Sequence, residues 1–282
     1  MSDAITIKLF LPKGDAKRVR IAEVSNWSGK GIAAPRKELY DLLERPELEQ
    51  AGVYILIGTD PEDGEPLAYI GEAEILKDRL RTHHAGKDFW NQVITFVSKD
   101  ENLTKAHVRY LESILIRETI EIGRSKLDNS QNSKARLPEA DQHDMAAFLK
   151  KIKQLLPVLG ADLLTPISEK SQKTTDSNVL TLKTKGHIAK GNRTNNGFVV
   201  YKGSEAAVEL RPAAKDWKWM LSIRDELLQK GSLELDDGRI AFAKDTEFSS
   251  PSAAAALICG GAMNGLIAWK DKDGKTLKEL EA

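Results

Sequence analysis

The chain lacks the features that mark disulfide-bonded, zinc-binding and membrane-spanning proteins. Its 282 residues include a single cysteine, Cys259. This excludes an internal disulfide and a cysteine-based zinc site, so we expect Cys259 to act as a small buried side chain. No stretch approaches the roughly 20 apolar residues of a membrane span, and residues 1–4 show no sign of a secretory signal. We therefore expect a soluble, cytoplasmic protein with no membrane partner.

An excess of charge of either sign is also lacking. Lysine plus arginine and aspartate plus glutamate number 42 each, so the formal net charge is zero. Such a chain has no long-range field that attracts a polyanion. Any surface that binds nucleic acid must be local.

A polar stretch divides the chain into two parts. Residues 166–178 are rich in Ser, Thr and Lys, with few side chains that can build a core, which is typical of a linker. The length allows a core on either side. We expect an α+β fold with an N-terminal extension at 1–50 that packs on a first domain at 51–165, and a second small α+β domain at 179–282.

Strand and helix patterns alternate along the first part. The extension contains a strand pattern at 5–11 and a helix pattern that begins at Pro35. Two β-rich runs, 52–57 and 67–71, flank a strong turn and predict a hairpin. A third strand is expected at 92–97.

Each strand of the hairpin carries a tyrosine. Alternation puts Tyr54 and Tyr69 on the face opposite their apolar neighbours, nearly across from each other. Taken alone, packing explains such a pair better than catalysis does.

A helix pattern follows at 74–84. Its spacing puts Arg79 and His83 on one face, together with Leu76 and Leu80, as a half-buried pair. Structural roles explain this pair as well as catalysis does. The arginine can extend its charged end to solvent, and the histidine can form a hydrogen bond with a backbone group.

Glu112 lies on a helix face that is otherwise apolar. Helical spacing places it beside Val108, Leu111, Leu115 and Ile116, on a helix that Thr104 is expected to cap. Burying an unpaired carboxylate costs several kcal/mol. We therefore expect a cation, hydrogen-bond donors or a metal ion to hold it.

Taken together, these motifs resemble the GIY-YIG nuclease superfamily. They are, in chain order, Gly52-Val53-Tyr54, Tyr69-Ile70-Gly71, Arg79 with His83, Glu112, and Asn129 in Leu127-Asp128-Asn129. The family includes homing endonucleases, some type II restriction enzymes and the incision subunit of bacterial nucleotide excision repair. The resemblance implies a small three-stranded antiparallel sheet flanked by helices.

The resemblance also implies a role for each matched residue. Tyr54 and Tyr69 would position or activate the attacking water, Arg79 would stabilise the phosphate, and His83 would assist proton handling. A tyrosine of normal pKa near 10 is a poor base at neutral pH. Which tyrosine acts stays open.

For Glu112, the resemblance implies the sole carboxylate ligand of a divalent ion, Mg²⁺ or Mn²⁺. Asn129 matches the terminal asparagine of the family's motifs. One hard cation and an arginine can together neutralise a phosphodiester and stabilise the leaving oxygen.

One position departs from the family pattern. Several members carry a lysine after Tyr-Ile-Gly, whereas this chain has Glu72. Either another cation such as Lys87 or Lys105 takes its place near nucleic acid, or Glu72 faces solvent with no effect; we favour the second.

The region 89–106 resembles a bacterial and archaeal subfamily that carries a C-terminal domain of unknown function. Here that domain would cover 179–282. We expect strands at Gly197–Tyr201, Arg239–Phe242 and Leu266–Trp269, helices at Ala213–Gln229 and after Ser250, and a solvated basic loop at Lys183–Asn196 that can also touch phosphate.

Part of this domain is similar to a small domain associated with restriction and modification enzymes. The similar residues are 249–255, Asn264-Gly265 and Trp269. The similarity suggests a DNA-reading module in which Ser250 and Ser252, at a helix N-terminus, bind phosphate. A helix cap with a core tryptophan explains the same residues equally well.

The sequence thus favours a metal-dependent endonuclease that cleaves DNA in repair, restriction or defence. The alternative is a non-cleaving DNA-binding or regulatory protein that keeps the fold. A third possibility is a protein that acts only with partners in a restriction or defence assembly. The choice between DNA and RNA, the substrate sequence and the oligomeric state stay open.

Overall fold

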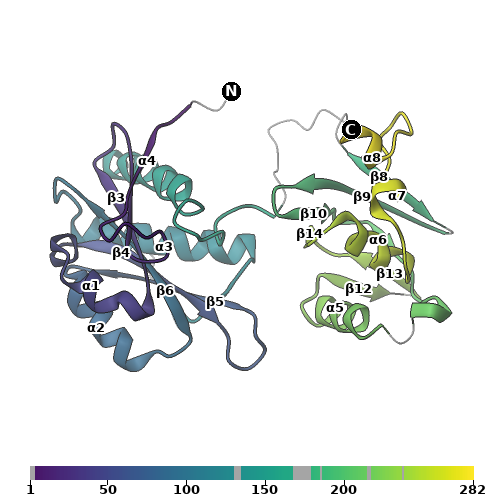
Figure 1. The fold of residues 1–282 in the computed structure, drawn as a ribbon, viewed down its shortest axis with the longest axis horizontal. Helices are drawn as coiled ribbons and strands as arrows, with labels where there is room; N and C mark the ends of the chain where they lie inside the picture. The colour runs from purple at the N-terminus through teal and green to yellow at the C-terminus, as the bar shows by residue number, and fades with distance from the viewer. Residues whose placement is uncertain (1–3, 130–134, 168–178, 185, 215–216, 237) are drawn as a thin grey trace. The chain divides into compact units, whose positions relative to one another are not determined.

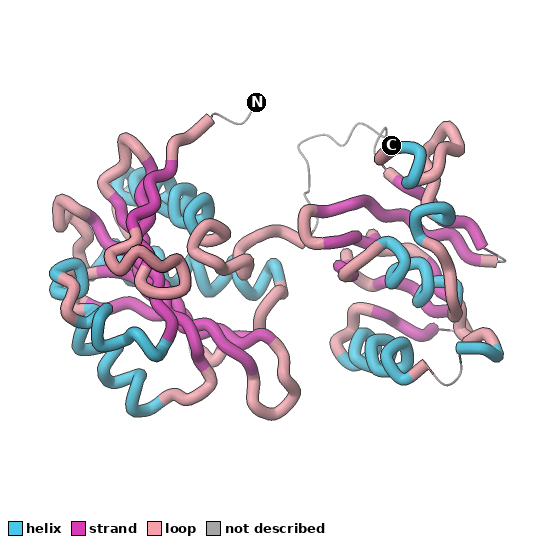
Figure 2. The backbone as a smooth tube through the Cα atoms, viewed as in Figure 1, coloured by secondary structure: helices cyan, strands magenta, loops and turns pink. Residues whose placement is uncertain are grey.

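The chain forms two compact units, residues 1–165 and 166–282. A computed structural model describes residues 4–129, 135–167, 179–184, 186–214, 217–236 and 238–282 (Figure 1). Both units mix helices and strands, as the sequence predicts (Figure 2). Most of the expected linker lies outside the described residues. Within the described ranges, no helix is long and apolar enough to cross a membrane.

A seven-stranded sheet forms the centre of the first unit. Its spatial order is β1-β2-β3-β6-β4-β5-β7, and neighbours are antiparallel except β5 and β7. The strands are β1 (Ile7–Phe10), β2 (Arg20–Val24), β3 (Gly29–Pro35), β4 (Gly52–Thr59), β5 (Pro66–Ala73), β6 (Trp90–Ser98) and β7 (Lys126–Leu127).

The three expected strands are β4, β5 and β6, which lie side by side in this larger sheet. The N-terminal extension continues the sheet, because β3 pairs with β6 along its length. The strands of the extension are therefore part of the sheet itself, while Leu39, Leu42 and Leu43 of the extension pack on one of its faces. Without β3, one edge of β6 would expose unpaired backbone groups.

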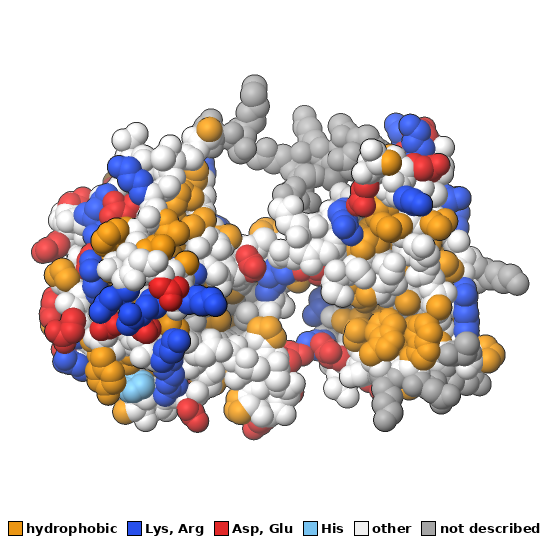
Figure 3. Space-filling view, in the orientation of Figure 1, with side chains coloured by type: hydrophobic (Ala, Val, Ile, Leu, Met, Phe, Trp, Pro, Cys, Tyr) orange, Lys and Arg blue, Asp and Glu red, His pale blue; other side chains and the backbone are white. Residues whose placement is uncertain are grey.

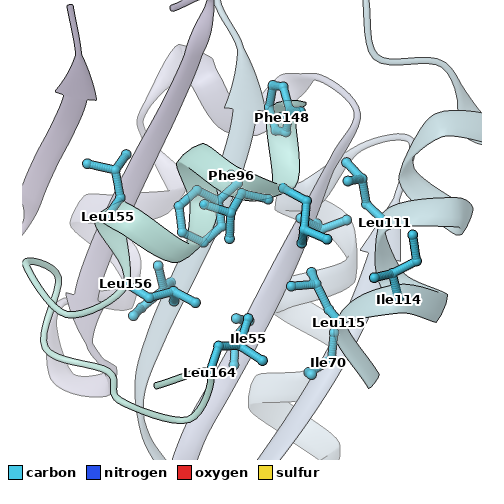
Figure 4. Close-up of a cluster of buried hydrophobic side chains, with 14 of the residues drawn as sticks. Ile55, Ile70, Phe96, Leu111, Ile114, Leu115, Phe148, Leu155, Leu156 and Leu164 are labelled. Carbon is cyan, nitrogen blue, oxygen red and sulfur yellow. The ribbon is translucent and has the colours of Figure 1, made fainter. Parts of the chain in front are cut away.

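Helices cover both faces of this sheet (Figure 1). They are α1 (Leu39–Leu43), α2 (Leu76–Gly86), α3 (Lys105–Ile122) and α4 (Glu139–Leu155), with short 3₁₀ turns η1 (Arg36–Glu38) and η2 (Pro46–Glu49). Residues of α3 and α4 pack on one face, around Ile55, Ile70 and Phe96 (Figure 4). Residues of α1 and α2 pack on the other, together with Tyr54.

Helix α3 begins and ends at strong local signals. The Thr104 hydroxyl accepts a hydrogen bond from the His107 backbone, and the helix ends at Gly123 in the left-handed conformation. The expected apolar stripe is buried, and Glu112 on the same helix is half-buried. The predictions of the Thr104 cap and of the buried face are confirmed.

The second unit contains two smaller sheets, in the orders β14-β10-β9-β8 and β11-β13-β12. Their strands are β8 (Leu180–Thr184), β9 (His187–Thr194), β10 (Gly197–Val200), β11 (Glu205–Ala206), β12 (Leu233–Asp236), β13 (Arg239–Phe242) and β14 (Thr246–Phe248). The helices are η4 (Pro212–Ala214), α5 (Lys218–Gln229), α6 (Pro251–Cys259), α7 (Gly265–Ala268) and α8 (Leu277–Leu280). Cys259 is buried, as expected.

Two predictions for this unit are wrong. The described part of Lys183–Asn196 contains the end of β8 and all of β9 instead of a loop. The expected strand at Leu266–Trp269 is the short helix α7, because the Asn264 side chain accepts a hydrogen bond from the Leu266 N–H and caps a helical turn.

Candidate active site

The hairpin of β4 and β5 places both predicted tyrosines on one face. Tyr54 pairs with Gly71 and Leu56 pairs with Tyr69, so the two tyrosines are diagonal neighbours whose ring centroids lie 6.1 Å apart. A Cβ at position 71 would collide with the Tyr54 ring and hydroxyl. The glycine of the second motif therefore makes room for the tyrosine of the first.

Helix α2 brings Arg79 and His83 to these tyrosines. The Tyr54 hydroxyl lies 2.7 Å from Nε2 of His83 and accepts a hydrogen bond of 3.2 Å from Nε of Arg79. Nη2 of Arg79 lies 3.5 Å from the Tyr69 hydroxyl. His83 is buried and Arg79 is exposed, so the expected half-buried pair is divided between the core and the surface.

Burial determines the protonation of this group. Burial, and then the proximity of Tyr69, raises the pKa of Tyr54 despite the opposing effect of Arg79. Burial, and then the positive charges of Arg79 and Lys87, lowers the pKa of His83 to about 4. Tyr54 is thus a neutral phenol and His83 a neutral imidazole, and the phenol donates to Nε2 in the tautomer that carries its proton on Nδ1.

Glu112 approaches the same group from helix α3. Burial, and then the carboxylate of Glu72, raises its pKa to about 7, while the Glu72 backbone N–H, Arg109 and Arg79 act in the opposite direction. Glu112, Glu72 and the two arginines therefore belong to one electrostatic cluster.

Glu72 is paired, which corrects the expectation that it faces solvent without effect. Its side chain is 17% exposed, and its Oε1 lies 3.3 Å from Nε of Arg109. The Glu72 carboxylate therefore contacts helix α3 through Arg109, and its charge raises the pKa of Glu112.

An open pocket of about 370 Å³ lies beside this cluster. The charged side chains that line it are Glu72, Glu74, Asp78, Arg79, Lys105 and Arg109. Lys105 Nζ lies 2.6 Å from Oε2 of Glu74. The cations at the pocket are therefore partly neutralised by neighbouring acids.

The donor set suits a hard divalent cation. Across the described residues, no group of three or more His, Cys, Asp or Glu side chains could hold a metal ion. Mg²⁺, however, is commonly bound through one or two carboxylates and keeps several waters. Glu112 is the carboxylate that would hold such an ion, and a cation there would relieve its repulsion with Glu72.

Lys87 and Asn129 both stabilise the Tyr69 strand. Lys87 Nζ lies 4.3 Å from the centroid of the Tyr69 ring and 2.5 Å from Oδ2 of Asp128. The Asn129 side chain accepts from the Ile70 N–H at 3.0 Å and donates to the Ile70 carbonyl at 2.7 Å. Asn129 thus positions the strand between the two site residues Tyr69 and Gly71.

In the second unit, Ser250 and Ser252 are engaged in local caps. The Ser250 hydroxyl accepts a hydrogen bond from the Ala253 N–H at 3.1 Å, and that of Ser252 accepts from the Gly265 N–H at 3.0 Å. The buried Trp269 donates from Nε1 to the Pro251 carbonyl. This geometry is that of a helix cap with a core tryptophan.

Three groups near the site were not predicted. They are the Arg109 guanidinium, the pairing of Glu72, and Asp128 as the partner of Lys87. For Arg109 the sequence held a signal, because it lies one helical turn before Glu112. The other two depend on how distant segments pack.

A comparison with known families identifies the second unit. Residues 180–281 match a family model described as "Domain of unknown function (DUF4357)". The second unit thus contains a domain of unknown function, close to the limits predicted from the sequence. Neither the curated proteins nor the solved structures gave a match. The match does not extend into residues 1–165.

Proposed function

We propose that the chain is an endonuclease of the GIY-YIG type that hydrolyses phosphodiester bonds in DNA with Mg²⁺ or Mn²⁺. One observation carries the proposal. The Tyr54 hydroxyl contacts both His83 and Arg79 beside Tyr69, and the charge of Arg79 also acts on Glu112 of helix α3. This arrangement accounts for the residues that resemble the family's motifs.

In this proposal Arg79 binds the phosphate. It is exposed, its charge is permanent, and Tyr54 and Tyr69 fix the direction of its guanidinium. Cleavage adds negative charge to the phosphate oxygens, and a preorganised cation stabilises that charge more in the transition state than in the ground state.

The two tyrosines have different roles. Tyr54 is fully buried and donates to the neutral His83, so it orients Arg79 and holds a proton. Tyr69 is half-buried, so its hydroxyl is the one open to the attacking water. Glu112 would hold the metal ion, which supplies charge neutralisation on the phosphate oxygens.

A cleavage assay tests the proposal. Purified protein is incubated with supercoiled, nicked, branched and single-stranded DNA, with and without Mg²⁺. We expect Mg²⁺-dependent cleavage of at least one substrate, and a loss of roughly a hundredfold or more in Glu112→Gln. Lys99→Ala, in a surface ion pair with Glu23 on β2, is the control. Equal cleavage by wild type and Glu112→Gln contradicts the proposal.

A second candidate is a non-cleaving DNA-binding module. Tyr54 is fully buried, and its hydroxyl is hydrogen-bonded to both His83 and Arg79. A tyrosine with a purely structural role also needs such partners. This candidate predicts Mg²⁺-independent DNA binding and no cleavage of any substrate.

A further inference from the structure

The mouth of the pocket is bordered by two basic side chains of α3. Lys105 and Arg109 are four residues apart, so they lie on the same side of the helix, and both are exposed. Arg79 of α2 lines the same pocket. Three cations from two helices therefore border one opening next to the proposed catalytic group.

Each α3 cation is paired with a glutamate at the β5 end of the hairpin. Arg109 contacts Glu72 through Nε at 3.3 Å, and Lys105 contacts Glu74 at 2.6 Å. Within the described parts of the chain, Nη1 and Nη2 of Arg109 have no hydrogen-bond partner. A guanidinium whose outer nitrogens are open can bind the two oxygens of a phosphate.

We propose that Lys105 and Arg109 bind backbone phosphates of DNA next to the cleaved bond, and that Glu72 and Glu74 occupy the phosphate positions in the free protein. The inference rests on the proposed function and deepens it. It gives the neutral chain a local cationic surface, which appears only when DNA displaces the two carboxylates. It also gives Glu72 a role: its negative charge lowers the affinity for DNA whose phosphates do not displace it from Arg109.

The carboxylates are suited to this displacement. The Lys105–Glu74 pair has side chains 50% and 60% exposed, and in the Arg109–Glu72 pair the guanidinium is 54% exposed and the carboxylate 17%. Exposed ion pairs of this kind are weak and are screened by salt. A phosphate that also contacts Arg79 can therefore replace them.

The test is DNA binding in EDTA, measured by fluorescence anisotropy with a labelled duplex of mixed sequence and two helical turns. We expect Arg109→Ala to weaken binding about threefold to tenfold and to reduce the slope of log K against log salt by about one. Lys105→Ala should act in the same direction, and Arg109→Lys should fall between wild type and Arg109→Ala. Glu72→Gln should bind roughly twofold to fivefold more tightly, because the competing carboxylate is gone.

The matched controls are Lys99→Ala and Glu23→Gln. These residues form an exposed ion pair away from β5. Lys99 lies in the turn after β6 and is 40% exposed, and Glu23 lies on β2 and is 29% exposed. Thermal unfolding of every variant checks that the fold is intact. Wild-type binding by Arg109→Ala, an equal loss in Lys99→Ala, or Glu72→Gln no tighter than wild type overturns the proposal.

Failure of this inference and failure of the nuclease can be told apart. The binding assay contains no divalent metal and needs no cleavage. If binding depends on Arg109 but no substrate is cleaved, the nuclease proposal is refuted and the proposal of a phosphate-binding surface stands. Cleavage with binding that does not depend on Arg109 refutes the phosphate surface alone.

Discussion

Tyr54 contacts two side chains, those of His83 and Arg79, through one buried hydroxyl. It shares a hydrogen bond with His83 and accepts one from Arg79, and Gly71 leaves the space for its ring. Tyr69 occupies the same face of the hairpin but is only half-buried. Similar motif positions therefore give two tyrosines with different environments.

Removing the two hydroxyl groups should have different effects. Tyr54→Phe leaves His83 without its partner in a buried place, so we expect a loss of about 1–2 kcal/mol in the free energy of unfolding. Tyr69→Phe should change it by less than about 0.5 kcal/mol. Urea unfolding of both variants measures the difference. Equal destabilisation of the two variants would contradict the difference that the burial of the Tyr54 hydroxyl predicts.

Several of the site residues could be located from sequence, and some could not. Alternation and helical spacing gave the shared face of Tyr54, Tyr69 and His83, because these patterns are local. The pairing of Glu72 with Arg109 joins residues 37 positions apart and depends on how α3 packs on β5. Nothing local in the sequence determines that contact.

At the scale of elements, Asn129 attaches the segment after β7 to strand β5. Its side chain replaces two backbone hydrogen bonds at Ile70. We expect Asn129→Ala to lower the free energy of unfolding by about 1–3 kcal/mol and to speed amide exchange at Ile70. Asn91→Ala is the control, because that side chain is exposed. Unchanged exchange at Ile70 would contradict this role.

Glu47 connects η2 to β3 by an ion pair that depends on pH. Burial would raise its pKa, but hydrogen bonds from Arg45 and Lys30 outweigh this and lower it to about 2. A pKa lowered by folding stabilises the protein above the unfolded value near 4.5, and this contribution is lost as the pH falls towards 2.

Glu47→Gln should therefore cost about 2 kcal/mol near neutrality. The gap between variant and wild type should close between pH 4.5 and 2. Urea unfolding across that range measures it. Glu49→Gln on the same turn is the control, since Glu49 is 57% exposed and its pair with Lys77 should contribute little. A gap that persists in acid would exclude the ionised pair as its cause.

The elements that the sequence predicted are those with local signals. The α3 cap and the hairpin turn are set by neighbouring residues, and both were found. Strand β3 is rich in Gly and Ala, which have low strand propensity, and it forms by pairing with β6 more than 50 positions away, as in Ile32 with Thr95. That pairing covers the β6 edge and could not be inferred locally.

At the scale of the whole molecule, side chains of opposite charge are mixed on the face that Figure 3 shows. This agrees with the zero net charge of the sequence. A protein without net charge depends on local contacts for any affinity to DNA. The proposed catalytic group and the proposed phosphate surface both lie in the first unit, whereas the family match covers the second.

The two units should therefore be separable. Each hydrophobic cluster of the described residues draws its members from one unit only. We expect a fragment of residues 1–165 to unfold cooperatively and to retain Mg²⁺-dependent cleavage, because it contains every proposed catalytic residue. Circular dichroism during urea unfolding and the cleavage assay measure both properties, with the full chain as the control. A fragment that folds but does not cleave, beside an active full chain, would place an essential part of the activity in the second unit.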